Sequence, residues 1–506
     1  MAFFVAVHFK GLVTARFATK YDASSLLFCT MARYTHQALL VCVFLGLGIM
    51  DFQAQENSPL KFANLPVIDE ELSADFFVRN RNRLRDTMGD SVVVVLLSAP
   101  QKTRSNDIDY RYHQDPDFYY FTGIEEPNSM LLLFKDSVEI DGEWLNEILF
   151  VESKNVKKER WTGRMLGLAE AKEESGAANV MSNIDFKSMP IPFKDFDFVY
   201  SNANQWIERD DKEHPGDLMS MDKHLKAKAE RAGVQIKVNA AEDLFGFLRQ
   251  HKSAEEIAML QQAIDITCEA QKNAMRSIVP GMTEYQVEAL IEYTFRSNGA
   301  SGAAFPSIVA GGSNGGIMHY TSNESLLIPG DLVVIDIGAE YEGYAADVTR
   351  TIPIDGTFSA EQAIIYQIVL DAQSVAIRYA TPGYKFWTPH EEAFRTIGKG
   401  LIKNGIITQW SEIGDYFIHG TSHYLGLDVH DSGIYSSLQP GEVITIEPGI
   451  YIPHGSPCDP KWWDIYVRIE DDILITAGAA KLLSSGAPKK ISEIEKIMDR
   501  GQASAD

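Results

Sequence analysis

Cysteine is scarce in this sequence. Four cysteines occur among its 506 residues, and two of them, Cys29 and Cys42, lie in an N-terminal stretch that resembles a leader. The spacing of the other two, Cys268 and Cys458, fits neither a disulfide framework nor a structural zinc site. We therefore expect the mature protein to contain two unpaired thiols.

Positive charge is scarce as well. The chain has 46 lysines and arginines against 70 aspartates and glutamates, which gives a formal net charge of −24. Nucleic-acid binding needs a basic face, so this balance excludes nucleic acid as an expected partner. Peptides, other proteins and small molecules remain. The hydrophobic content of 45% and the length of the chain predict a globular protein with two domains and a leader.

The sequence also offers little that could form a membrane helix. The apolar run from Ala38 to Met50 has 13 residues, which is too short to span a bilayer comfortably, so we expect no stable membrane span. The run follows Arg33 and ends shortly before Ala54. This is the order of a secretory signal peptide that is cleaved after Ala54.

We accordingly expect residues 1–54 to be a leader, with Met31 as the true start of the protein. The mature protein would then be exported, either to a periplasm or out of the cell. The alternative for residues 1–30 is an amphipathic anchor or a transit segment. Without a signal peptide, the expected location is the cytoplasm.

Five carboxylate or imidazole side chains lie in settings suited to metal binding. They are Asp336 in VVIDIG, Asp347 in YAADVT, His423 in TSHYLG, Glu447 in TIEPG and Glu470 in VRIED. A carboxylate inside an apolar run needs a partner charge or a metal to offset its desolvation. Four oxygen donors and one imidazole suit a pair of divalent ions better than a structural zinc, which prefers thiolates. Each acid alone is equally well explained as an ion-paired core residue, but the five together favour a metal site.

The local patterns indicate how two of these acids are brought together. Asp336 and Asp347 are expected on the two strands of a hairpin, because Gly343 between them permits a tight turn. Glu447 is expected at the end of a strand that stops at Pro448 and Gly449. Glu470 is expected on a further strand.

These segments resemble the pita-bread metallopeptidases, and among them the aminopeptidase P, or Xaa-Pro aminopeptidase, family. The resemblance is carried by SIVAGGSNGGIMHYTSNE (307–324), GDLVVIDIGAEYEGYAADVTRT (330–351), HGTSHYLGLDVHD (419–431), LQPGEVITIEPGIYI (438–452) and VRIEDD (467–472). It implies that two divalent ions are bound by Asp336, Asp347, His423, Glu447 and Glu470. The expected ion is Mn²⁺, with Co²⁺ or Zn²⁺ as alternatives, because oxygen-rich sites accept several ions.

The resemblance also implies the reaction, which is release of the first residue from peptides whose second residue is proline. Two metals that share one water generate a hydroxide that attacks the peptide carbonyl, and Glu447 is placed to take the proton of that water. The catalytic residues implied are His319, His430 and Glu447. His419 and Arg468 are expected to bind substrate, and Arg468 also to pair with the ligand carboxylates; the alternative for Arg468 is a purely structural ion pair.

Two other functions remain open within the same fold. Prolidases, which cut Xaa-Pro dipeptides, share the ligands but commonly carry an insertion between the His and Glu motifs, and Asp431 and Pro440 are too close for one here. A non-catalytic peptide-binding protein is disfavoured because metal-free relatives lack the ligands that this chain has. Tyr466 stands where the family often has glycine, which bears on substrate preference.

The expected fold class is α/β (α+β), with an N-terminal α/β domain over 65–240 and a C-terminal pita-bread catalytic domain over 241–490. The first domain is predicted from buried strands at 92–100, 130–134, 143–153 and 196–202 and helices at 69–88 and 222–233. The segments 110–133 and 158–171 also resemble the N-terminal domain of aminopeptidase P. That resemblance implies a homo-oligomer, either a dimer or a tetramer.

The second domain begins with two helices that carry capping-box patterns. Ser253 with Glu256 and Thr283 with Gln286 have the required spacing, and the second helix is expected to close at Gly299. Further helices are predicted at 359–380 and 389–405. Helices behind a curved, mainly antiparallel sheet match the pita-bread fold.

Overall fold

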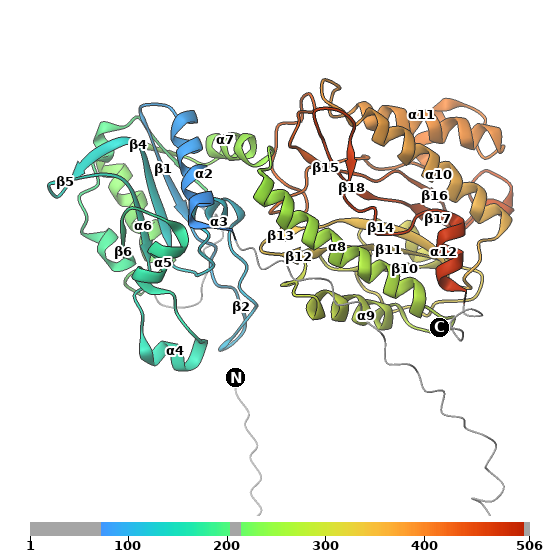
Figure 1. Cartoon of the computed structure of the whole chain (residues 1–506), viewed down its shortest axis with the longest axis horizontal. Coiled ribbons are helices and arrows are strands. Elements are labelled where there is room, and N and C mark those ends of the chain that lie inside the picture. The colour runs from blue at the N-terminus through green and yellow to red at the C-terminus, as the bar shows by residue number, and fades with distance from the viewer. Residues whose placement is uncertain (1–71, 203–213, 500–506) are drawn as a thin grey trace, which may run out of the picture. The chain divides into compact units, whose positions relative to one another are not determined.

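A computed structural model of the chain describes residues 72–202 and 214–499 (Figure 1). The expected leader, 1–54, lies outside the described residues. Within the described ranges, no helix combines the length and the hydrophobicity that a membrane crossing requires. Cys268 is buried and Cys458 half-buried, and neither forms a disulfide within the described residues.

The N-terminal part is built on a six-stranded mixed sheet. Its strands follow the order β6-β5-β4-β1-β7-β8, with β1–β4 and β4–β5 antiparallel and the other pairs parallel. The strands are β1 (Val92–Leu97), β4 (Met130–Ile140), β5 (Glu143–Val151), β6 (Val180–Ser182), β7 (Phe198–Ser201) and β8 (Gln235–Lys237), and a separate pair is β2 (Thr103–Ser105) and β3 (Ile108–Asp109). Every residue of β1 is buried, because both faces of the sheet are covered.

Helices cover this sheet on both faces. They are α2 (Ala74–Thr87), α3 (Pro116–Thr122), α5 (Gly167–Ser175) and α6 (Leu218–Ala232). The short helix α4 (Val156–Thr162) has no buried residue. Helix α3 begins where Asp115 accepts a hydrogen bond from the Phe118 amide at 2.9 Å, with Pro116 as its first residue. It ends at Gly123, whose φ of 70° is a left-handed conformation that favours glycine. The predicted strands and helices of this domain are therefore found, with boundaries that shift by a few residues.

Helix α7 (Asn239–Arg249) leads into the second part of the chain, which begins with α8 (Ala254–Ser277). The predicted capping box is formed, since Ser253 Oγ accepts from the Glu256 amide at 3.3 Å and Glu256 Oε2 accepts from the Ser253 amide at 2.8 Å. Helix α9 (Glu284–Ser297) follows, and the chain turns at Gly299 with a φ of 93°.

The second part has antiparallel strands backed by long helices (Figure 1). The strands are β9 (Gly302–Ala303), β10 (Ile308–Gly311), β11 (Leu332–Ile337), β12 (Ala339–Tyr341), β13 (Tyr344–Ala345), β14 (Val348–Pro353), β15 (Val443–Ile446), β16 (Gly449–Ile452), β17 (Ile465–Arg468), β18 (Asp471–Leu474) and β19 (Lys481–Leu482). The remaining helices are α10 (Ala360–Tyr379), α11 (Thr388–Lys403) and α12 (Ile491–Met498). Both helices predicted here, 359–380 and 389–405, are confirmed.

Three details of the predicted strands differ from the structure. Strands β11 and β14 are antiparallel neighbours, with Asp336 opposite Thr349, but the small hairpin β12–β13 lies between them and contains the turn at Gly343. Gly449 does not stop the sheet; it begins β16. Glu470 is not on a strand, because the chain there leaves β17, which pairs with β16, and enters β18, which pairs with β15.

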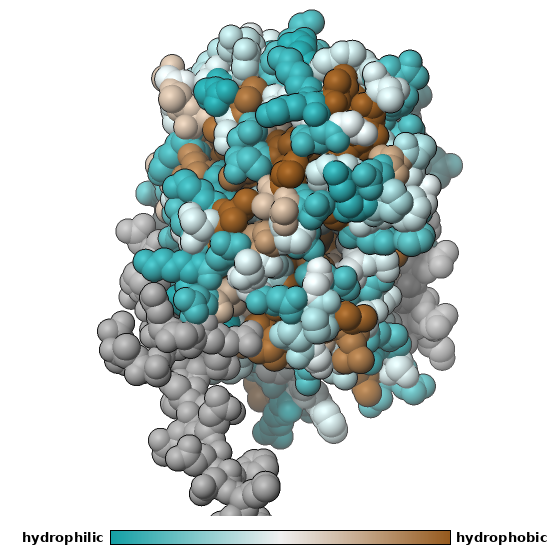
Figure 2. All heavy atoms as spheres, turned by 90° about the vertical axis from the view of Figure 1, so that its right-hand side faces the viewer, coloured by the Kyte–Doolittle hydropathy of each residue, from teal (hydrophilic) through white to brown (hydrophobic). Residues whose placement is uncertain are grey.

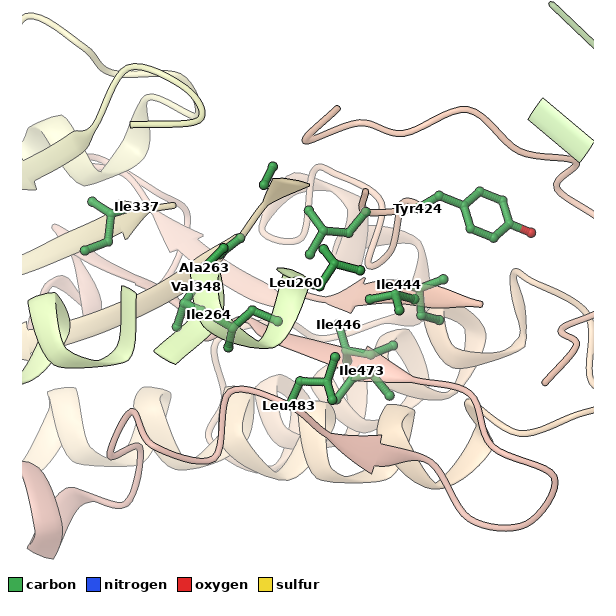
Figure 3. Close-up of a cluster of buried hydrophobic side chains, with 14 of the residues drawn as sticks. Leu260, Ala263, Ile264, Ile337, Val348, Tyr424, Ile444, Ile446, Ile473 and Leu483 are labelled. Carbon is green, nitrogen blue, oxygen red and sulfur yellow. The ribbon is translucent and has the colours of Figure 1, made fainter. Parts of the chain in front are cut away.

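Helix α8 and the strands behind the site share one hydrophobic core. Leu260, Ala263 and Ile264 of α8 belong to the same buried cluster as Ile444 and Ile446 of β15 (Figure 3). By contrast, polar residues cover most of the outer face shown in Figure 2, where hydrophobic residues form only separate small groups. The core therefore fixes the sheet that carries the candidate ligands.

Replacement of Leu260 by alanine tests this packing. The side chain is fully buried, so Leu260→Ala should lower the free energy of unfolding by about 2–5 kcal/mol. The matched control is Leu326→Ala, because Leu326 is 60% exposed. Thermal unfolding should show a clearly lower melting temperature for Leu260→Ala and an almost unchanged one for Leu326→Ala. An equal fall in both variants would contradict this account of the core.

Candidate active site

One cavity of about 340 Å³ contains every site residue that the sequence predicts. Its lining consists of Asp336, Asp347, His423, Glu447, Glu470, His319, His419, His430 and Arg468, together with Met318, Gly420, Ser422 and Tyr435. Five of the acidic and imidazole groups, namely His419, His423, His430, Glu447 and Glu470, lie more than 70 residues after Asp347 in the sequence. The fold therefore gathers distant residues into one polar cavity.

Backbone hydrogen bonds hold the segments that carry these side chains. The Glu447 amide donates to the Thr421 carbonyl at 2.8 Å, and the Thr445 amide donates to the His423 carbonyl at 3.0 Å. The Glu470 amide donates to the Thr349 carbonyl at 3.1 Å. These bonds tie the His423 loop to β15 and the Glu470 segment to β14. His423, Glu447 and Glu470 are thus held through the main chain.

Three of the candidate ligands meet closely enough to share one ion. Ligand atoms of Asp347, His423 and Glu470 all lie within 4.8 Å of one another. His423 Nε2 is 3.5 Å from Asp347 Oδ2 and 3.9 Å from Glu447 Oε1. Asp336, on β11, lines the same cavity. The donor set of four carboxylates and one imidazole suits Mn²⁺, Co²⁺ or Zn²⁺.

Two buried oxygen atoms show that the protein alone does not satisfy these acids. Asp336 Oδ1 and Asp347 Oδ1 are buried and have no hydrogen-bond partner among the described residues. Buried carboxylate oxygens in this state need a compensating charge. Both lie in the cavity, so a divalent cation fits the residues present.

The acidity of the carboxyl groups leads to the same conclusion. Burial, together with the nearby charge of Asp336, raises the pKa of Asp347 well above its ordinary value. Burial and Asp347 do the same to the pKa of Glu470, and burial raises the pKa of Glu447 to about 7. Without a cation, the folded state therefore loses stability as pH rises above about 4 through these raised values.

A hydrogen-bonded chain runs from Asp336 to His419. Arg468 donates from Nη2 to Asp336 Oδ2 at 2.7 Å and from Nη1 to the Tyr451 hydroxyl at 3.1 Å. The same hydroxyl lies 2.8 Å from His419 Nε2. Burial and the charge of Arg468 lower the pKa of His419 to about 4, so His419 is neutral at pH 7. This chain orients one ligand carboxylate and one cavity imidazole together.

His319 and His430 lie on the more open side of the cavity. Both are exposed, and His319 follows the glycine-rich turn 312–316. The His430 ring meets the His423 ring edge to face at a centroid distance of 4.4 Å. Burial and the neighbouring His423 lower the pKa of His430. An exposed imidazole beside a ligand is suited to contact a bound substrate.

Tyr451 was missed by the sequence analysis. It lies in β16, whose four residues are all buried, so no polar alternation in sequence marks it as a site residue. Its partners His419 and Arg468 are 32 and 17 residues away. Tyr466 does not line the cavity; it packs against Gly315 and Gly316, in the turn before His319.

Comparisons with known proteins identify the family of the chain. The chain matches the model for metallopeptidase family M24 over residues 258–477 and the model for the aminopeptidase P N-terminal domain over residues 77–190. It is 35% identical over 443 residues to the Xaa-Pro aminopeptidase of Escherichia coli K12, covering 85% of this chain and 98% of that protein. The chain belongs to the aminopeptidase P family. The second domain is therefore an M24 pita-bread metallopeptidase domain.

Other members of the aminopeptidase P family extend the similarity. Human Xaa-Pro aminopeptidase 3 is 34% identical over 423 residues, covering 81% of each chain. The structure of the E. coli enzyme with the inhibitor Pro-Leu superimposes with a TM-score of 0.76 at 35% identity, covering 85% of this chain and 99% of that one. A zinc-substituted form of the E. coli enzyme with product gives a TM-score of 0.74.

Removal of metal should destabilise the protein. A cation that binds only the folded state at a free concentration 100 times its dissociation constant adds about 2.7 kcal/mol of stability, so adding Mn²⁺ to chelated protein should raise the melting temperature. Asp347→Asn should abolish most of this rise. The control variant Asp371→Asn changes an exposed acid on α10. It should show the same rise in melting temperature with Mn²⁺ as the wild type. A full response in Asp347→Asn would exclude Asp347 as a ligand.

Proposed function

We propose that the protein is a metal-dependent aminopeptidase that releases the N-terminal residue from peptides with proline in second position. The observation that carries the proposal is the pair of unsatisfied carboxylate oxygens, Asp336 Oδ1 and Asp347 Oδ1, in a cavity that also contains three further candidate ligands. Peptides with proline in second position are proposed as the substrates because the chain belongs to the aminopeptidase P family.

Two divalent ions would be held by Asp336, Asp347, His423, Glu447 and Glu470. Bound there, they supply Lewis acidity, which lowers the pKa of water and polarises a carbonyl. Mn²⁺ is the ion that we propose first, with Co²⁺ and Zn²⁺ as alternatives. Thr349 supports this set, because its hydroxyl donates to Glu470 Oε2 at 2.6 Å and fixes the rotamer of that carboxylate.

Proton transfer and substrate binding are assigned to four histidine and arginine positions around the cavity and to the ligand Glu447. Glu447 accepts the proton of the attacking water and passes it on, and it lies between His423 and His419 at 3.9 and 3.6 Å. His319 and His430 contact the substrate at the scissile peptide and stabilise the negative charge that develops on its carbonyl oxygen. His419 lines the substrate pocket as a neutral imidazole held by Tyr451. Arg468 contributes to substrate binding and keeps Asp336 in place.

A peptide panel tests the proposed activity. With Mn²⁺ present, the protein should cleave an Xaa-Pro-Xaa tripeptide and leave an Xaa-Ala-Xaa control intact, and chelation should stop the reaction. The measurement is release of the free N-terminal amino acid. Preference for an Xaa-Pro dipeptide would instead identify a prolidase, and metal binding without cleavage of any peptide would identify a peptide-binding protein.

We also propose that the protein is exported and assembles as a dimer or tetramer. Export rests on the signal-peptide pattern that ends at Ala54, and assembly rests on the resemblance of the first domain to that of aminopeptidase P. The N-terminal sequence of protein recovered from the host should begin at Gln55, and its mass by light scattering should be two or four times that of one chain. A recovered chain that still begins at Met1 or Met31 would rule out cleavage.

A further inference from the structure

Arg249 is a buried cation that contacts both parts of the chain. It is the last residue of α7, and its side chain is 3% exposed. Nη1 donates to Asp117 Oδ1, on α3, at 2.7 Å. Nη2 donates to Asp428 Oδ2 at 2.8 Å and also to Asp431 Oδ1. One guanidinium therefore joins a helix of the N-terminal domain to the loop 426–434 of the catalytic domain.

The end of α7 holds that loop at further points. Lys252 donates to Asp431 Oδ2 at 2.7 Å, so both oxygens of Asp431 are bound by buried cations. The amide of Ile434 donates to Gln250 Oε1 at 2.7 Å. The backbone also approaches closely, since a side chain built at Gly246 would lie 3.2 Å from the Gly433 nitrogen. The loop is thus clamped by residues that do not themselves line the cavity.

His430 lies within this loop, between the two acids that Arg249 binds. Its ring lines the cavity beside His423. Among the described residues, no hydrogen bond or ion pair holds the His430 imidazole itself, and the ring is exposed. The position of the ring therefore depends on the backbone of the loop, and the loop depends on its clamp.

We propose that Arg249 is a positioning residue for catalysis: by binding Asp117, Asp428 and Asp431 together, it sets His430 at the substrate and makes turnover depend on the docking of α3. This inference rests on the proposed function. Buried ion pairs are often neutral for stability but fix one arrangement among several. Displacement of a catalytic group by about 1 Å can cost on the order of 100-fold in rate.

The test compares two buried arginines. Arg249→Lys keeps the charge but cannot reach three carboxylates at once, and kcat should fall about 10- to 100-fold, with KM and metal content nearly unchanged. The matched control is Arg81→Lys. Arg81 is 1% exposed, pairs with Glu147 at 3.0 Å and donates to the Phe121 carbonyl, all within the N-terminal domain. Arg81→Lys should lower the melting temperature without lowering kcat.

A double variant separates positioning from general damage. If Arg249 acts through His430, then Arg249→Lys with His430→Ala should be no slower than His430→Ala alone. Multiplicative losses would overturn the proposal, as would an unchanged kcat in Arg249→Lys. Asp428→Asn gives a milder variant, because the Asp428 side chain is 44% exposed; it should lower kcat in the same direction by a smaller factor.

Hydrogen exchange tests the clamp without any activity measurement. Amides of the loop 426–434 should exchange faster in Arg249→Lys than in the wild type, and at the wild-type rate in Arg81→Lys. Unchanged exchange in Arg249→Lys would overturn the proposal even if the peptidase activity is confirmed. If exchange is faster in Arg249→Lys but the wild-type protein cleaves no peptide, the role of Arg249 in holding the loop would be supported and the proposed function would be refuted.

Discussion

Repulsion among buried carboxylates is the constraint on which the catalytic domain depends. Asp347, Glu447 and Glu470 each have a raised pKa because they are taken out of water beside other acids. The residues that follow Glu470 show how the fold limits this cost. Asp471 binds Arg350 and Lys489, and Asp472 accepts from the Asp347 amide at 3.2 Å. Cations thus compensate Asp471, whereas Asp472 Oδ1, like Asp336 Oδ1 and Asp347 Oδ1 in the cavity, has no hydrogen-bond partner among the described residues.

Much of the catalytic core could be predicted from the sequence, because the ligands lie in short segments whose neighbours are distinctive. The capping box of α8 was also predictable, since it depends on residues three positions apart. The strand assignment of Glu470 was wrong, because the chain passes from one sheet to another within two residues, Ile469 and Glu470, and leaves no break in the hydrophobic pattern. Tyr451 and Arg249 were missed for another reason: their partners are between 17 and 182 residues away, and neither residue type marks a site by itself.

The buried cations outside the cavity are better explained by geometry than by stability. A buried ion pair loses most of its Coulombic gain to desolvation, so a hydrophobic replacement would often be as stable. Arg350 and Arg249 both contact carboxylates next to functional residues, namely Asp471 beside Glu470 and the two acids that flank His430. In both cases the cation fixes a segment that a hydrophobic side chain would leave free to shift. The cations therefore act on the position of the neighbouring functional group.

The charge balance of the cavity is compatible with the two ions that we propose. Four ionised carboxylates and Arg468 give a net charge of about −3, with His419 neutral because its pKa is lowered. One divalent ion would leave the cavity negative, which would repel both a hydroxide and a developing oxyanion. Two ions would leave it slightly positive, and a site of that sign would stabilise the negative charge that peptide hydrolysis places on the carbonyl oxygen. The four carboxylates are costly for folding, but they set the negative charge that would balance two divalent ions during catalysis.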